Sequence, residues 1–585
     1  MNTLTKFDLA SSLRNSRLGP DRTAGTVLSL MLLWSQTPAS KLKGLPSFRD
    51  ASAEFILKDP SRVARTLAPE LSDSIVSNLA DHHSSELESL RRAVMNGLDA
   101  HSPVGEIADA ILELCAPYAS VASETSAILI AVLDAKKGSR VRCAFSYAMR
   151  TAWALANDVT VDLDIENADL APLISILAAA CDRSIKVQVN TIDSVAQATD
   201  AHDAAEHALI FPPIGMRLRV DRPSLSRSGA AIGDQISSES LGALWGAHAG
   251  KGRNIVVVGN GLLFRTSSKD AAFKQDLFHD HGLEAVISLP RGTFSGTAIA
   301  MSALVFSGDG RLKGRQRRIR FIDGSDSALD ASALPELLDG KERQHPLCAD
   351  ASLEQISETG FNLSVDRYVL DAETRRTREM LNRQKTVRLF DLADIRRPQA
   401  LPRESGKEST FEVREALLAD IDNGRLSLPT KLSELPRSAS TKIESAVLRP
   451  GDILLSIKGT IGKAALVTDS AIAESDTVPI VPGQSFVIVR LRKGGAITDP
   501  RALVSYLRSP LAQSLLHGMA GGTTIPNVAM GELKDMPVPI PNEQAQATLL
   551  KKFDEYSQIL RDIDVLRSRM KITEDEMFNI TLNSK

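Results

Sequence analysis

The stretch IVVVGNGLLFRTSSKDAAFKQDLFHDHGLEAVISLPRGTFSGTAIAMSALVFS (255–307) determines the fold of the larger part of the chain. Three β-branched runs fall in or overlap this stretch, namely RNIVVVG (253–259), LEAVISL (283–289) and SALVFSG (302–308), and the helix-like run SKDAAFKQDLFHD (268–280) lies between the first two. The same pattern begins upstream, with VTVDLDI (159–165), KVQVNTI (186–192) and HALIFPP (207–213). This alternation predicts a parallel sheet with helices on both faces. Ligands of such sheets bind at the carboxyl ends of the strands.

The flanking segments differ from this region in composition. Residues 1–120 have helical apolar spacing, whereas 387–541 consists of short strands and turns. Near the end, apolar residues recur three or four positions apart, as in a two-faced helix or a short coiled coil: Phe553, Tyr556, Leu560, Ile563, Leu566 and Met570. We therefore expect a multidomain protein: an α-helical N-terminal domain (1–120), an α/β Rossmann-like domain (121–370), a helical connector (371–386), a mixed α+β domain (387–541) and a C-terminal long helix or coiled coil (542–585).

Composition excludes several classes of protein. The 585 residues carry 69 Lys and Arg against 72 Asp and Glu, and 43% are hydrophobic, as in an ordinary globular protein. The 4% of aromatic residues argues against binding of a single strand by stacking. The four cysteines are far apart, so we expect neither a disulfide framework nor a metal site. The start has no apolar signal core, and no apolar run approaches the roughly 20 residues that a membrane helix needs. We expect a cytoplasmic protein that is not attached to a membrane.

The middle of the chain resembles a known family. The stretch 255–307, with the tail FNLSVDRYV (361–369), resembles the N-6 adenine DNA methylase domain of type I restriction-modification methylase subunits. The resemblance extends over 1–370 and implies a fold that binds S-adenosylmethionine (SAM). It also implies a target adenine that is flipped out of the duplex before the methyl group is transferred.

The cofactor loop of that family departs from its pattern in this chain. Where the family has DPaCGSG, the sequence has CAFSYAM (143–149), so Cys143 replaces the aspartate, and Tyr147 and Met149 replace the glycines. Glycine there permits close backbone approach, so we expect the bulky side chains to fill the space of SAM. The family also needs an acidic residue after the second strand for the ribose hydroxyls. Asp164 and Asp193 are the candidate remnants of that position.

The target-base motif is altered as well. Where the family has N-P-P-F/Y, the sequence has Phe211, Pro212, Pro213 and Ile214, so the amide acceptor and the stacking ring are both missing. Methyl transfer needs both reactants in line. We therefore expect no cofactor and no methyl transfer. The alternative is an active SAM-dependent adenine methyltransferase with diverged motifs, in which this register would be wrong.

The carboxyl-terminal third resembles the specificity subunit of the same systems. The matching segments are VLRPGDILLSIKGTIGKAALV (447–467) and GGTTIPNVAMGELKDMPVPIPNEQ (521–544). The resemblance implies that 387–541 is a target-recognition domain for double-stranded DNA and that a helical spacer follows it. The candidate phosphate contacts are Lys458, Lys463, Arg490, Arg492 and Lys493. A second basic cluster at 311–320 either extends this DNA contact or is a solvated loop.

These patterns lead to one functional hypothesis. Specificity subunits typically carry a pair of recognition domains, and this chain has one, so we expect a homodimer or a partner subunit bound through the C-terminal helix. The protein would recognise a DNA sequence in a bacterial restriction-modification or anti-phage defence system with an inactive methylase-like domain. Beside the active methyltransferase, a non-catalytic scaffold for a defence complex remains an alternative.

Overall fold

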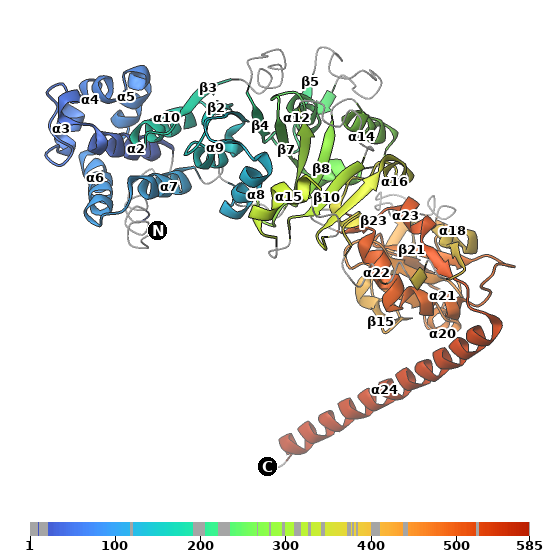
Figure 1. Ribbon diagram of the computed structural model, residues 1–585. Helices are drawn as coiled ribbons and strands as arrows, with labels where there is room; N and C mark the ends of the chain where they lie inside the picture. Colours follow the sequence, from blue (N-terminus) through green and yellow to red (C-terminus); the bar gives the residue numbers. More distant parts are fainter. Residues whose placement is uncertain are drawn as a thin grey trace. The chain divides into compact units, whose positions relative to one another are not determined.

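The computed structural model describes most of the chain (Figure 1). The described residues are 10, 22–116, 121–190, 205–219, 235–265, 267–279, 282–294, 299–308, 318–325, 329–340, 345–370, 376, 380–381, 384–398, 410–436, 443–521 and 526–583. The chain divides into two compact units, Met1–Val369 and Leu370–Lys585. Within the described part, no helix is both long and apolar enough to cross a bilayer.

The first unit begins with a group of helices. They are α2 (Arg22–Gln36), α3 (Ala53–Lys58), α4 (Pro60–Leu67), α5 (Ser72–Ala80), α6 (Ser84–Asp99) and α7 (Val104–Cys115). The side chains of Ser52 and Asp59 cap α3 and α4 by accepting hydrogen bonds from backbone N–H groups. Helix α2 packs closely on α10 (Leu170–Ala180), and a Cβ at Gly25 would lie 2.5 Å from Leu173 Cδ1. The small residue therefore permits the contact between these helices.

A nine-stranded sheet forms the centre of this unit, in the order β11-β10-β8-β9-β7-β4-β1-β2-β3. The strands are β1 (Arg140–Ala144), β2 (Thr160–Ile165), β3 (Ile185–Val189), β4 (His207–Ile210), β7 (Arg253–Gly259), β8 (Leu283–Ser288), β9 (Met301–Ser307), β10 (Arg318–Asp323) and β11 (Cys348–Ser352). A separate short ribbon pairs β5 (Arg217–Arg219) with β6 (Gln235–Ser237). The four strand pairs between β7 and β3 in this order are parallel, as the sequence predicts.

The predicted all-parallel sheet is wrong at β9 and β11. Strand β9 runs antiparallel to both β7 and β8, and β11 runs antiparallel to β10. A parallel neighbour requires a long crossover, usually through a helix. No helix lies among the described residues between β8 and β9, so the chain returns beside β8 in the opposite direction.

Helices cover both faces of the sheet, as predicted (Figure 1). They are α8 (Ser123–Leu133), α9 (Met149–Leu155), α10, α12 (Ser238–Gly246), α13 (Asn260–Phe264), α14 (Ser268–His279), α15 (Leu334–Leu338) and α16 (Leu353–Glu358). Alternate residues of β7 enter different hydrophobic clusters, because Ile255 and Val257 lie in one and Val256 and Val258 in the other. The sheet is thus buried on both sides, and its carboxyl-end loops are the accessible place for a site.

The second unit is built mainly from short strands. A six-stranded sheet has the order β13-β21-β18-β19-β16-β15, and a three-stranded sheet has the order β17-β14-β20. Their strands are β13 (Ala393–Arg396), β14 (Thr410–Ala416), β15 (Ile421–Asp422), β16 (Arg425–Leu426), β17 (Leu432–Pro436), β18 (Ile453–Ser456), β19 (Ala464–Leu466), β20 (Ile480–Pro482) and β21 (Phe486–Leu491). Strand β12 (Thr386–Arg388) pairs with β24 (Pro537–Pro539), and β22 (Ala520–Gly521) pairs with β23 (Asn527–Val528).

The helices of this unit lie mostly after the strands of the large sheet. They are α18 (Leu389–Leu392), α20 (Asp469–Ala473), α21 (Pro500–Leu507), α22 (Pro510–Gly518), α23 (Met530–Asp535) and α24 (Glu543–Asn583). The 41-residue helix α24 confirms the predicted long C-terminal helix. Its first part packs against α21, and Leu549, Leu550 and Phe553 lie against the core of the unit.

Candidate functional site

Strand β1 ends at the place in the sheet where the family's cofactor loop is expected. It lies between β2 and β4, and Cys143 has no exposed surface. Burial, with the charges of Asp164 and Asp162, raises the pKa of the Cys143 thiol far above its usual range. Cys143 is therefore a neutral residue of the core.

The loop after β1 makes a tight turn without glycine. Phe145 has φ 72° and ψ 154°, a region that residues other than glycine rarely occupy. Its backbone N–H donates to the carbonyl of Asp164 at 2.7 Å, and the next three residues form a single 3₁₀ turn before α9. The backbone therefore turns sharply at this position, but every residue of the turn carries a side chain.

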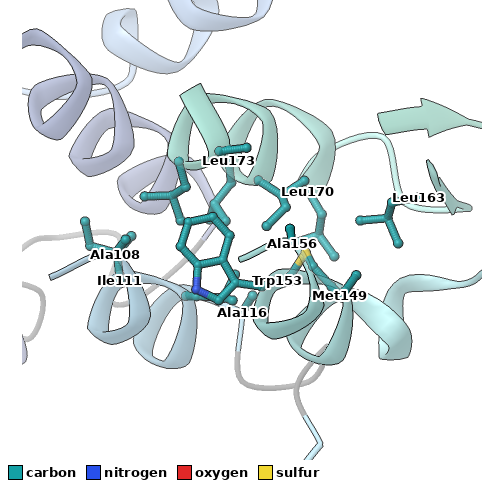
Figure 2. Close-up of a cluster of buried hydrophobic side chains, with 14 of the residues drawn as sticks. Ala108, Ile111, Ala116, Met149, Trp153, Ala156, Leu163, Leu170 and Leu173 are labelled. Atoms are coloured by element: carbon teal, nitrogen blue, oxygen red, sulfur yellow. The ribbon is translucent and has the colours of Figure 1, made fainter. Parts of the chain in front are cut away.

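The replacements at 147 and 149 lie in different places. Met149 is fully buried, and Figure 2 shows it in the cluster that contains Trp153, Leu163 and Leu170. Because Met149 is the first residue of α9, its side chain packs into the core beneath the helix. Met149 is therefore a core residue, and that it fills the space of the cofactor stays a prediction. Tyr147 is only partly buried and packs at the edge of that core.

Tyr147 belongs to an aromatic cluster, which we define as Tyr147, Phe211 and Phe294. The ring centroids of Tyr147 and Phe294 are 4.7 Å apart, and those of Phe211 and Phe294 are 6.0 Å apart in an edge-to-face arrangement. The three residues follow β1, β4 and β8 along the chain. Phe294 also forms a backbone bridge with Val121, in the loop before α8. Side chains from separate loops thus meet at the carboxyl end of the sheet.

The loop after β4 is held by α12 and β7. Phe211 has no exposed surface, and Pro212 packs so closely on α12 that a Cβ at Gly242 would lie 2.3 Å from its ring. The hydroxyl of Ser238 donates to the carbonyls of Pro213 and Met216. These contacts fix the segment that carries the altered target-base motif, and Ile214, its last residue, is half-buried.

A buried carboxylate joins the same loop to β7. Glu239 accepts hydrogen bonds from the backbone N–H groups of Gly259, at 3.1 Å, and of Gly215, at 3.4 Å. Each oxygen of this carboxylate thus accepts a hydrogen bond within the fold. Glu239 was not predicted from the sequence, because the two loops that it joins are distant along the chain.

Asp164, the predicted acidic remnant that lies within the described residues, is paired inside the fold. Asp164 is buried within β2 and accepts from Arg142 at 2.8 Å and from Asn190 at 3.3 Å. Asp193 lies outside the described residues. Glu166 directly follows β2 and accepts a 2.9 Å hydrogen bond from the backbone N–H of Ser146. Sequence reasoning missed Glu166, although its position just past the last apolar residue of the strand was the available signal.

Two of the predicted DNA contacts in the second unit are held by other protein groups. Arg490 on β21 donates to both carboxylate oxygens of Asp452, at 2.6 and 2.7 Å, and only 1% of the Asp452 side chain is exposed. These hydrogen bonds, together with the charge of Asp452, raise the pKa of Arg490 above its usual value. Lys463 Nζ donates to the carbonyls of Leu418 and Ile421, at 2.9 and 3.3 Å. These two cations have clear roles inside the domain.

The other predicted cations are more accessible. Arg492 is exposed and lies 4.7 Å from the ring centroid of Phe390, and Lys493 is exposed in the turn after β21. Lys458 is half-buried beside Asn527, with which it forms a backbone bridge. In the second basic cluster, 311–317 lies outside the described residues, and Arg320 is paired with Asp350 at 2.7 Å. A role in DNA binding stays a prediction for all of these residues.

Comparison with protein families gives two matches. Residues 245–377 match the model of the N-6 DNA methylase family, and residues 384–564 match the model of the type I restriction modification DNA specificity domain. No curated protein matches the chain.

Comparison with solved structures gives matches at low sequence identity. The methyltransferase subunit of the type I restriction-modification system of Streptococcus thermophilus is 18% identical, with a TM-score of 0.45, over 63% of this chain and 98% of that one. The type IIG restriction endonuclease BpuSI is 13% identical, with a TM-score of 0.45, over 94% and 74%. The type I S subunit from M. genitalium is 16% identical, with a TM-score of 0.24, over 35% and 48%.

Proposed function

We propose that this chain, which joins a segment of the N-6 DNA methylase family to a type I specificity domain, recognises a sequence in duplex DNA without methylating it. It would act in a bacterial restriction-modification or anti-phage defence system, with the cleaving or signalling activity in another chain. The observation that carries this proposal is the aromatic cluster at the carboxyl end of the sheet.

The aromatic cluster argues against methyl transfer in two ways. A methyl donor and a flipped adenine must meet in line at the ends of β1 and β4. Tyr147 and Phe294 are in contact there, and the loop lacks the glycines that would let SAM approach the backbone. Phe211 is apolar where an amide would accept the amine hydrogens of adenine, and Pro213 already accepts from Ser238. These side chains do not fit SAM together with a target base.

The second unit supports DNA recognition. Its matched family is defined by DNA specificity. Arg492 and Lys493 are exposed at the end of β21, where they are able to reach phosphates without breaking an ion pair of the core. Arg490, in contrast, would have to leave the buried Asp452. We therefore assign phosphate contact to the exposed end of β21 rather than to the strand itself.

One observation favours the active methyltransferase as a second candidate. Glu166 lies directly after β2, where the family places the acid that binds the ribose hydroxyls, although here it accepts from Ser146 N–H. A nucleoside would bind there if Glu166 accepted hydrogen bonds from the ribose hydroxyls instead of from the Ser146 N–H group. The substitution Glu166→Gln therefore belongs in the test.

The test combines binding and transfer measurements on the full chain. We expect no heat of binding when SAM is titrated, no labelled methyl on genomic duplex DNA, and a gel shift that competitor DNA of random sequence does not remove. Binding of SAM that Glu166→Gln weakens, together with labelled DNA, would establish the methyltransferase instead. Absence of any preferred duplex would favour the scaffold.

A further inference from the structure

The second unit has an aromatic ring at its surface beside two cations. Phe390 on α18 is 38% exposed, and among the described residues outside α24 no other aromatic side chain is exposed. The Cζ atom of Arg492 lies 4.7 Å from the centroid of this ring, and the Nζ atom of Lys534 lies 5.3 Å from it. Both distances are within the range of a cation–π interaction. We call these three residues the Phe390 cluster.

Backbone hydrogen bonds hold the elements of the Phe390 cluster together. Helix α18 packs against α23, which carries the lysine, and its residues Leu389 and Leu392 are buried (Figure 1). The N–H group of Leu389 donates to the carbonyl of Met536, directly after α23, at 2.9 Å. The N–H group of Arg492, directly after β21, donates to the carbonyl of Leu392 at 2.9 Å. The ends of α23 and β21 are therefore fixed on either side of the exposed ring.

The positive charge of the Phe390 cluster is only partly neutralised. The nearby carboxylates pair with other cations: Asp391 and Asp535 with Arg388, and Asp394 with Arg396. Asp394 also lies 3.9 Å from Arg492, a longer contact than its 2.7 Å hydrogen bond from Arg396. No described carboxylate pairs with Lys534. Because a ring restrains a cation without cancelling its charge, the cluster keeps charge that a bound anion would neutralise.

The spacing of the two charges fits the backbone of a nucleic acid. They lie no further apart than the sum of their distances to the ring centroid, about 10 Å. A DNA strand carries one phosphate per about 3.4 Å of helix axis, so neighbouring phosphates fit this span. A guanidinium that lies over a ring still has N–H donors in its own plane for a phosphate. Interfaces with DNA are also much more positively charged than those with proteins, so these features favour DNA over a protein partner.

We infer that the Phe390 cluster binds phosphates of one strand of duplex DNA. Arg492 and Lys534 make the contacts, and Phe390 is the positioning residue that holds both cations in place. The inference rests on the proposed function and adds α23 to the exposed end of β21 as a place of contact. Since phosphates carry no direct sequence information, the cluster fixes where the domain lies on the duplex and does not select bases.

Titration of labelled duplex over a salt series, with the full chain, tests the two cations. We expect Arg492→Met and Lys534→Met each to reduce the slope of log affinity against log salt by about 1, equally on genomic and on random-sequence duplex. Lys571→Met removes the same charge from an exposed position on α24, so it should keep the parental slope. A parental slope in Lys534→Met would overturn the phosphate site and leave the Phe390 cluster as a surface for a protein partner.

The role of Phe390 is tested without a change of charge. Phe390→Leu removes both cation–π contacts, so we expect the affinity for duplex to fall roughly 3- to 10-fold at every salt concentration, with the parental slope. Phe390→Tyr keeps a ring and should lose less, and denaturant unfolding shows whether each variant keeps the fold. Parental affinity in a folded Phe390→Leu variant would overturn the positioning role. A parent chain that binds no duplex would refute the proposed function as well, whereas variants that bind as tightly as a binding parent would refute only the Phe390 cluster.

Discussion

Phe211 is the residue that most directly tests the proposed absence of methyl transfer. Phe211→Asn restores the family's amide but leaves Tyr147 against Phe294, so we expect no labelled methyl on DNA. The variant also loses a fully buried ring and buries an amide, which should lower the free energy of unfolding by about 3–5 kcal/mol. Denaturant unfolding and a methyl-transfer assay on the same sample measure both effects. Methyl transfer by this single variant would show that the aromatic cluster does not block the donor.

Lys274 gives the fold a pH dependence of known sign. The side chain is 1% exposed and donates to the carbonyl of Leu263 at 2.8 Å, and burial lowers its pKa from 10.5 to about 7. Between these values the unfolded chain binds more protons than the folded chain, so stability rises with pH from about 7 to about 10. We expect Lys274→Met to reduce this slope by up to about 1.4 kcal/mol per pH unit.

The measurement for Lys274 is chemical unfolding at several pH values. The exposed Lys269 lies on the same helix, so Lys269→Met is the matched control and should keep the slope of the parent chain. Identical slopes in the parent chain and Lys274→Met would mean that Lys274 keeps its proton inside the fold.

Single residues also show how much the spacing of motifs in the sequence predicts. The register at Cys143–Met149 predicts bulky residues near the end of β1, but it does not show that Tyr147 lies against Phe294 while Met149 is fully buried. That difference depends on where α9 begins, because its first residue is turned inward. Phe294 and Glu239 were missed because each acts through a contact with a loop that is distant in sequence.

At the scale of single elements, Arg490 on strand β21 and Lys493 in the turn after it are expected to have different roles, one in stability and the other in DNA contact. Removing Arg490 leaves the buried Asp452 without its cation, so we expect Arg490→Met to lower the free energy of unfolding by about 3–5 kcal/mol. Lys493→Met, in the exposed turn, should leave stability unchanged. If Lys493 contacts a phosphate, that variant should reduce the slope of log affinity against log salt by about 1. A loss of stability in Lys493→Met, or an unchanged slope, would contradict the assignment.

The elements themselves were predictable where their periodicity is strong. The runs at 159–165, 207–213 and 253–259 become β2, β4 and β7, because each is long and apolar enough to be buried on both faces. The direction of β9 was not predictable from its own residues, since it is set by the connection from β8. The short strands β15 and β16 were missed because two residues show no periodicity.

At the scale of the whole molecule, the amino-acid composition and the packing of the hydrophobic core give different domain boundaries. Composition changes near residue 120, whereas one buried cluster continues from Ala24 to Leu338. Figure 2 shows Trp153 of α9 beside Ile111 of α7, and Trp153 Nε1 donates to Asp109. The N-terminal helices therefore share a core with the sheet. A helix that buries its apolar stripe against a neighbouring domain has the same sequence pattern as one that buries it within its own.

The last prediction concerns how the association of two copies affects DNA binding. If two copies join through exposed apolar side chains on one face of α24, among them Ile559 and Leu566, each recognition domain makes its own phosphate contacts, and the salt dependence of the pair is the sum of both. Disrupting that face with Leu566→Asp should then give a single-copy protein whose slope of log affinity against log salt is about half that of the parent. Val565→Asp adds the same charge at an equally exposed position outside that face, so it should keep both the dimer and the slope. Titration of labelled duplex over a salt series, beside sedimentation of each variant, measures the two quantities together. A monomeric Leu566→Asp variant with the full parental slope would mean that one copy makes all the phosphate contacts, and that pairing through α24 serves something other than DNA reading.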